Sequence, residues 1–221
     1  MAEPAWHRLP GGGRLQLWPQ KAAFDPDLGL LLVADAHIGK AVSFRRLGVP
    51  VPQGTTSEAL DRLDALLRAT GAGEIVFLGD LLHSARAHAA ATLAAVARWR
   101  DRHPRLALTL VRGNHDLHAG DPPAALGVQV VDGPLRRGPW ALSHHPEPSA
   151  DGYVLAGHVH PCVALGGRGG RAHDRLRLPC FHFGAQVGVL PAFGGFTGMH
   201  ALPRAPSDRL FALADDRVVA L

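Results

Sequence analysis

A chain of 221 residues, 47% of them hydrophobic, can bury a full core as one domain, so neither disulfides nor an obligatory partner is needed to explain its folding. No uninterrupted apolar run is long enough to span a membrane, and the start Met-Ala-Glu-Pro lacks the basic stretch and apolar run of a signal peptide, which excludes the membrane-spanning and secreted classes. Lys and Arg outnumber Asp and Glu by 23 to 19, a balance that favours polyanionic partners. We therefore expect a soluble cytoplasmic protein with a single domain over residues 1–221.

The first half of the chain predicts alternating strands and helices. The apolar run 30–34 ends at Asp35, as expected of a strand buried on both faces. After a loop rich in Gly and Pro, Thr55 or Thr56 can cap a helix in which leucines recur at helical spacing. The remaining predicted elements are a strand over 74–78, an Ala-rich helix over 87–99 and a strand over 106–111.

The second half of the chain predicts a second sheet, made of short strands between Gly and Pro turns. These predicted strands cover residues 128–131, 140–143, 153–156, 176–183 and 186–190. In both halves, short blocks of polar residues stand immediately after apolar strands. Because α/β folds place their active sites at one edge of their sheets, we expect these blocks to gather there.

The polar blocks contain the residue types of a site for two metal ions. Asp35 and His37 stand two residues apart, so both can face one ion, and the carboxylate of Asp80 can bridge a metal pair. Asn114 adds a neutral amide oxygen, and three imidazoles that suit Mn, Fe or Zn complete the set: His144, His158 and His160. Cys162 and Cys180 do not form a metal-type pair, so we expect two buried thiols.

In chain order the blocks are D-A-H-I-G, G-D-L-L-H, R-G-N-H-D, S-H-H-P and G-H-V-H-P, and they span Asp35 to Pro161. Together they resemble the five-block signature of the calcineurin-like metallophosphoesterases. The resemblance implies an α/β fold, namely a four-layer α/β/β/α sandwich with two mixed sheets between helices. It also implies two metal half-sites that share Asp80: one adds Asp35, His37 and His160, and the other adds Asn114, His144 and His158.

Only one of the adjacent His144 and His145 can be the expected ligand. We favour His144, because Ser143-His144 continues the predicted strand, while His145 either contacts substrate or faces solvent.

A site of this kind predicts in-line attack on phosphorus by a hydroxide that bridges the metals, with a general acid to assist the leaving oxygen. His115 follows the expected ligand Asn114 and is the candidate acid, with Asp116 able to orient its ring. His83 lies three residues beyond Asp80 and either hydrogen-bonds the substrate phosphate or faces solvent.

A narrower resemblance covers nearly the whole chain. The segments D-A-H-I-G-K, F-R-R-L-G-V-P-V-P-Q-G-T-T, L-G-D-L-L-H-S and L-P-A-F-G-G-F-T-G look like the ligase-associated DNA damage response endonucleases, also called Lhr-Core-associated metallophosphoesterases. That family implies manganese-dependent phosphodiesterase and DNA endonuclease activity in bacterial DNA repair, alongside a helicase, an ATP-dependent DNA ligase and an exonuclease. Ligand chemistry alone also permits iron or zinc.

Basic side chains near the metal blocks can contact the phosphates of DNA, or belong to a solvated loop. They are Lys40, Arg45, Arg46 and Arg112. The segment 193–198, with its two phenylalanines, is expected to pack in the core rather than stack on bases. An alternative function, phosphomonoesterase or small-nucleotide phosphodiesterase, fits the same metal site.

Overall fold

The computed structural model describes residues 3–41, 44, 48, 55–166 and 176–221, which form two β-sheets and a small set of helices. The α-helices whose full extent lies within the described residues are α2 (Thr55–Thr70), α3 (Ala90–Arg102) and α4 (Asn114–Ala119), and the 3₁₀ helices there are η1 (Ala85–His88) and η2 (Ala124–Leu126). The predicted helix of regularly spaced leucines is observed, with Thr55 and Thr56 as its first helical residues rather than as a preceding cap, whereas the predicted helix over 87–99 is divided between η1 and α3.

The first sheet has seven strands that lie side by side in chain order. Its members are β1 (Ala5–Arg8), β2 (Arg14–Trp18), β3 (Ala22–Asp25), β4 (Leu30–Val33), β5 (Glu74–Leu78), β6 (Ala107–Val111) and β7 (Val128–Val131). Strands β1 to β4 are antiparallel, and β4 to β7 are parallel. The sequence predicted β4, β5 and β6, missed β1 to β3, and assigned β7 to the second sheet, although it pairs with β6.

The second sheet has eight strands, seven of them in the order β15-β14-β12-β13-β10-β9-β8, with β11 paired to β12. Its members are β8 (Leu135–Arg137), β9 (Trp140–Leu142), β10 (Tyr153–Ala156), β11 (Cys162–Leu165), β12 (Leu176–Phe183), β13 (Val187–Val189), β14 (Arg209–Ala214) and β15 (Arg217–Ala220). Strands β9 and β10 are parallel, so their carboxyl ends point the same way.

The first sheet is covered by apolar side chains on both faces. On β4, Leu31 and Val33 pack in a core shared with α2 and α3, while Leu30 and Leu32 pack against the second sheet. Strand β5 divides its side chains in the same way. Successive side chains of a strand alternate between faces, so a strand buried on both sides needs an unbroken apolar run. This alternation explains why the runs at 30–34 and 74–78 predicted strands correctly.

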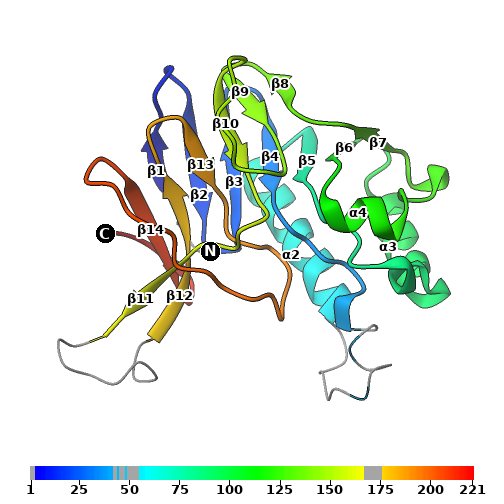
Figure 1. Ribbon diagram of the computed structural model, residues 1–221. Helices are drawn as coiled ribbons and strands as arrows, with labels where there is room; N and C mark the ends of the chain where they lie inside the picture. Colours follow the sequence, from blue (N-terminus) through cyan, green and yellow to red (C-terminus); the bar gives the residue numbers. More distant parts are fainter. Residues whose placement is uncertain (1–2, 42–43, 45–47, 49–54, 167–175) are drawn as a thin grey trace.

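The described residues form three layers rather than the expected four. Helices α2, α3 and α4 gather at one side of the molecule, and β11, β12 and β14 lie at the other (Figure 1). After η2, the described residues 128–166 and 176–221 contain no helix, so the predicted outer helical layer is not confirmed. Among described residues, the model contains no helix with the length and apolar character needed to cross a bilayer. Cys162 and Cys180 are buried free thiols, as expected.

Candidate metal centre

The ends of five strands bring the predicted ligands together. In the first sheet, Asp35, Asp80 and Asn114 follow the carboxyl ends of the parallel strands β4, β5 and β6. In the second sheet, His144 follows β9, and both His158 and His160 follow β10. Backbone bonds from His37 N–H to the Asp80 carbonyl (2.9 Å) and from Ile38 N–H to the Leu81 carbonyl (2.8 Å) extend the strand pairing into the site. The predicted gathering of polar blocks is therefore observed.

One group of ligand atoms consists of Asp35, His37 and His160, whose donor atoms lie within 4.8 Å of one another. His160 Nε2 lies 3.7 Å from Asp35 Oδ1, and His37 Nε2 lies 3.9 Å from Asp80 Oδ2. The other ring nitrogen of His160, Nδ1, is 3.1 Å from the Gly198 carbonyl. A hydrogen bond from the remote ring nitrogen to a carbonyl is the usual way in which proteins orient a metal-binding histidine.

A second group surrounds His144, whose ring is buried. His144 Nδ1 lies 3.0 Å from the Leu78 carbonyl, and donation of this N–H leaves Nε2 of the neutral ring unprotonated. Nε2 is 2.9 Å from Asn114 Oδ1, 3.1 Å from His158 Nδ1 and 3.6 Å from Asp80 Oδ1. Electron-pair donors that face one another at these distances suit a cation between them.

The structure distinguishes the adjacent histidines 144 and 145. His144 is buried and faces Asn114 and Asp80, whereas His145 is exposed and packs its ring edgewise against His158, 4.4 Å between centroids. The favoured position of His144 in the ligand cluster fits this geometry, and His145 lies at the solvent side of the same cluster.

Burial and charge also fit a cation here. The side chains of Asp35 and Asp80 are buried, and their ion-pair partners in the described part of the chain are histidines rather than Lys or Arg. Burial, with Lys40 nearby, lowers the pKa of His37 to about 2, so this ring is neutral. Its Nδ1 is buried without a hydrogen-bond partner among the described residues. Buried carboxylates need a compensating charge, and metals bind the neutral imidazole.

The backbone is strained at the ligands themselves. Eight described residues other than glycine have positive φ, and five of them are predicted ligands: Asp35 (49°), His37 (44°), Asp80 (52°), His158 (71°) and His160 (52°). This region costs free energy for residues with a Cβ, and such strain concentrates at functional sites. The conformations let short loops aim successive side chains at one point.

Gly157 allows the two sheets to approach each other beneath the ligands. A Cβ at this position would lie 2.6 Å from Asp35 Oδ2 and 2.9 Å from the Ala34 Cβ. Gly157→Ala is therefore expected to destabilise the fold by about 1–3 kcal/mol, typical of overpacking, and to weaken metal binding by displacing Asp35. Chemical unfolding and metal titration measure both effects. Gly73→Ala is the matched control, because its added Cβ meets nothing within 4 Å; equal behaviour of the two variants would contradict the prediction.

His115 lies beside the ligand cluster, and a different group from the expected one orients its ring. His115 Nε2 is 4.0 Å from Asp80 Oδ2, and Nδ1 is 3.2 Å from the carbonyl oxygen of His83. The rings of His115 and His83 stack with their centroids 5.3 Å apart. His83 is therefore a neighbour of the candidate acid, and burial, with Lys40 and His115, lowers its pKa to about 4.

The predicted role of Asp116 is wrong. Its carboxylate accepts the backbone N–H groups of Asp80 (2.7 Å), Leu81 (3.0 Å), Leu82 (3.3 Å) and Gly113 (2.9 Å) rather than the His115 ring. Burial raises the pKa of Asp116, partly offset by these hydrogen bonds. Asp116 fixes the loop that carries Asp80, which the sequence could not reveal because the three donors in that loop are more than thirty residues away.

The predicted phosphate contact of Arg112 is not supported. Its guanidinium binds Asp121 through two nitrogens, at 3.0 Å each, and also bonds Asp132. These carboxylates raise the pKa of Arg112 and occupy its donors.

Lys40 is partly buried, and burial lowers the pKa of its ammonium group. The carboxylates of Asp35 and Asp80 oppose that shift, so the ammonium group interacts electrostatically with the ligand cluster. Arg45 and Arg46 lie outside the described residues.

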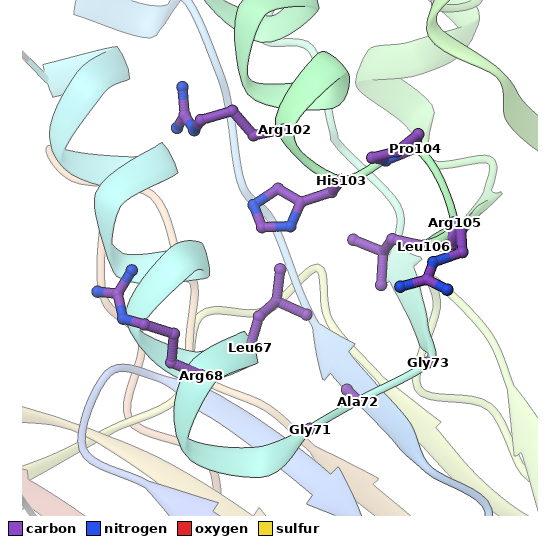
Figure 2. A pocket seen from close by; sticks show the side chains of 10 residues that line it. All are labelled: Leu67, Arg68, Gly71, Ala72, Gly73, Arg102, His103, Pro104, Arg105 and Leu106. Carbon is purple, nitrogen blue, oxygen red and sulfur yellow. The ribbon is translucent and has the colours of Figure 1, made fainter.

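A large cavity lies away from this cluster, at the opposite edge of the first sheet. It has a volume of about 610 Å³ and is formed by the end of α2, the end of α3 and the loops that follow them (Figure 2). Two of its polar side chains, Arg102 and His103, are bound to Asp64 at 2.9 and 2.7 Å. The size of this cavity would make it a candidate binding site, but its lining contains none of the predicted ligands.

A mixed α/β fold of two large sheets, with buried Asp and His donors at the strand ends, is the arrangement expected of a metal-dependent hydrolase. Neither a search of protein-family models nor a search of curated proteins finds a match. The crystal structure of Pseudomonas putida nuclease MPE is similar over 99% of this chain and 100% of that one, with 45% identity and a TM-score of 0.86. A phosphoesterase from E. coli, YfcE, aligns with 86% of this chain and 96% of its own at 16% identity and a TM-score of 0.40, too low to bear on the assignment.

The chain therefore belongs to the metallophosphoesterase family that includes this Pseudomonas nuclease, and it is a hydrolase acting on phosphoester bonds.

Two side chains beside the cluster were missed by sequence reasoning. Lys21 and Phe196 line a cavity together with His160. Lys21 lies between two strands that were not predicted, and Phe196 belongs to the segment expected to pack in the core. Phe193 of that segment is fully buried as expected, whereas Phe196 is 52% exposed.

Proposed function

We propose that this protein is a metal-dependent nuclease that hydrolyses phosphodiester bonds in DNA with two divalent ions, Mn²⁺ being the best candidate. The observation that carries the proposal is that Asp80 faces both groups of donors, with Oδ2 toward His37 and Oδ1 toward His144. A carboxylate in that position suits a bridge between two ions.

The chain's residues would divide between the two ions as the spacing of the donors suggests. Asp35, His37 and His160 would hold one ion, Asn114, His144 and His158 the other, and Asp80 both. The imidazole donors beside the carboxylates favour Mn, Fe or Zn over Mg or Ca. When bound, the ions supply Lewis-acid stabilisation of the negative charge on the phosphate oxygens and activate water as the nucleophile.

Protein side chains supply the remaining steps. The His115 ring, held by the His83 carbonyl through Nδ1, keeps Nε2 toward the cluster, where it can donate a proton to the leaving oxygen. Asp116 holds the Asp80 loop rigid through three backbone bonds. The positive charge of Lys40, which interacts with Asp35 and Asp80, would attract the phosphate of the substrate.

A nucleic acid as the substrate is supported by the 45% identical nuclease and by the net charge of +4. DNA as that nucleic acid, and DNA repair as the setting, are proposed from the resemblance of the sequence segments to the ligase-associated endonucleases. Action together with a helicase, an ATP-dependent DNA ligase and an exonuclease is part of the same proposal.

The experiment combines metal analysis with a comparison of substrates. Protein loaded with Mn²⁺, Fe²⁺, Zn²⁺ or Mg²⁺ is assayed against bis-p-nitrophenyl phosphate, p-nitrophenyl phosphate and supercoiled plasmid. We expect Mn²⁺ to support hydrolysis of the diester and nicking of the plasmid, with the monoester turned over more slowly. An enzyme that hydrolyses only the monoester would instead be a phosphomonoesterase, and diester hydrolysis without nicking would indicate a small-nucleotide phosphodiesterase.

A further inference from the structure

A cavity of about 190 Å³ opens directly beside the ligand His160. Its wall includes Lys21, Phe196, Thr197 and Met199. Pockets that enclose a whole drug-sized ligand measure about 300 Å³ or more, so this one suits a single phosphate or base of a longer molecule. Its position next to the metal centre means that a bound group would neighbour the reacting phosphate.

Lys21 brings an uncompensated positive charge to this cavity. The residue is partly buried, at a positive φ of 66°, and its side chain has no ion pair or hydrogen bond within the described part of the chain. Burial lowers its pKa, and the guanidinium of Arg62 lowers it further. Arg62 is itself fixed, 2.7 Å from the Phe193 carbonyl and over the Phe193 ring. A cation in such surroundings gains free energy when an anion binds.

Phe196 offers an aromatic ring that is half exposed to solvent. It is 52% exposed and adopts a positive φ of 57°, which a phenylalanine takes only under strain. By contrast, Phe193, three residues earlier, is buried in the core. Exposed aromatic rings in basic surroundings are the groups on which proteins stack nucleobases.

The loop that carries Phe196 is bound at both ends to the metal centre. At its start, the N–H groups of Phe193 and Gly194 donate to the carbonyls of Ala34 (2.8 Å) and Asp35 (3.0 Å). At its end, the Gly198 carbonyl lies 3.1 Å from His160 Nδ1, and His200 N–H donates to the His160 carbonyl at 3.0 Å. The ring is therefore held at a defined place relative to two predicted ligands.

From these contacts we propose that the cavity binds the nucleotide next to the cleaved phosphodiester, with Lys21 contacting its phosphate and Phe196 stacking on its base. The proposal rests on the proposed nuclease function and adds a subsite to it. A base can stack on Phe196 only when it is not stacked within a duplex, so the subsite requires an unpaired nucleotide.

The test compares Lys21→Met and Phe196→Ala with the parent protein. Binding of a fluorescein-labelled oligodeoxythymidine is measured by anisotropy in the presence of a chelator, and kcat/KM is measured with Mn²⁺ for the same strand and for bis-p-nitrophenyl phosphate. Phe196→Ala should weaken binding by about 5- to 150-fold, the range for loss of one stacked base. Lys21→Met should reduce the slope of log affinity against log salt by about 0.7, as for one phosphate contact on a single strand. Turnover of the small diester should be unchanged, which also demonstrates that both variants are folded.

Arg105→Met is the matched control, because it removes one exposed positive charge at the opposite edge of the first sheet. A set of strands, each with one abasic site at a different position, adds a second comparison. At one position, the abasic site should weaken binding of the strand to the parent protein but leave its binding to Phe196→Ala unchanged. If both variants bind the strand like Arg105→Met, the subsite is wrong even though the nuclease function stands. If the parent hydrolyses the small diester but neither binds nor cuts DNA, the nuclease function itself fails.

Discussion

Asp80→Asn is expected to remove metal binding and turnover together. The Asp80 side chain is buried, and its two oxygens face the two donor groups, 3.9 Å from His37 Nε2 and 3.6 Å from His144 Nε2. Asn preserves the shape of the side chain but lacks its charge. It also keeps an oxygen for the backbone N–H of His115, whose nitrogen lies 2.9 Å from Asp80 Oδ1. Because loss of an outer-shell partner alone costs about 10- to 100-fold in metal affinity, loss of a bridging ligand should cost more than about 100-fold.

Elemental analysis after loading with Mn²⁺ and assay of bis-p-nitrophenyl phosphate measure the two effects of Asp80→Asn. Chelated protein gives an independent measurement: without metal, the variant should melt at a higher temperature than the parent, since a buried carboxylate without a compensating cation destabilises the fold. Asp27→Asn, at an exposed carboxylate paired with Arg14, should leave metal content and rate unchanged. Full metal content in Asp80→Asn would exclude Asp80 as the bridging ligand.

The strands that end at the polar blocks, and the clustering of those blocks, were predictable from the sequence because both depend on local pattern. An unbroken apolar run followed by a polar block marks a parallel strand buried on both faces and its carboxyl end, as at Leu30–Val33 before Asp35. Parallel strands then bring their carboxyl ends to one edge without further information. The clustering of Asp35 and Asp80 follows from this rule, whereas His144, which follows β9 in the second sheet, joins them through the packing of the two sheets.

Other features depend on partners that a local pattern does not reveal. The sequence around Arg112 predicts a phosphate contact, whereas in the structure its guanidinium binds Asp132, twenty residues later in the chain. Asp116 is adjacent to His115 in sequence, yet its carboxylate faces the Asp80 loop. Strand β7 has the same short apolar pattern as the strands of the second sheet, and only its pairing with β6 assigns it to the first. The turn between β2 and β3 places Lys21 in the wall of the cavity that His160 also lines, although the two residues are far apart in the sequence.

His115→Ala is expected to keep the metals and lose rate. The His115 side chain is 42% exposed, and its Nε2 lies 4.0 Å from Asp80 Oδ2. Its removal takes away a proton donor worth about 10²- to 10⁴-fold while leaving the ligand set intact. The loss should be larger for DNA than for bis-p-nitrophenyl phosphate, because the nucleoside leaving group is the poorer one and needs the proton more.

His115→Asn separates proton donation from a structural role. Its side-chain amide can still donate to the His83 carbonyl, the contact that His115 Nδ1 makes at 3.2 Å, but it has no group that can transfer a proton to the leaving oxygen. If His115 donates a proton, His115→Asn and His115→Ala should be equally slow on DNA and bind equal amounts of Mn²⁺. His103→Ala, at the far edge of the first sheet beside Asp64, should be as active as the parent. Recovery of the rate in His115→Asn would instead mean that the ring acts by holding the His83 loop, and loss of Mn²⁺ from His115→Ala would make it a ligand.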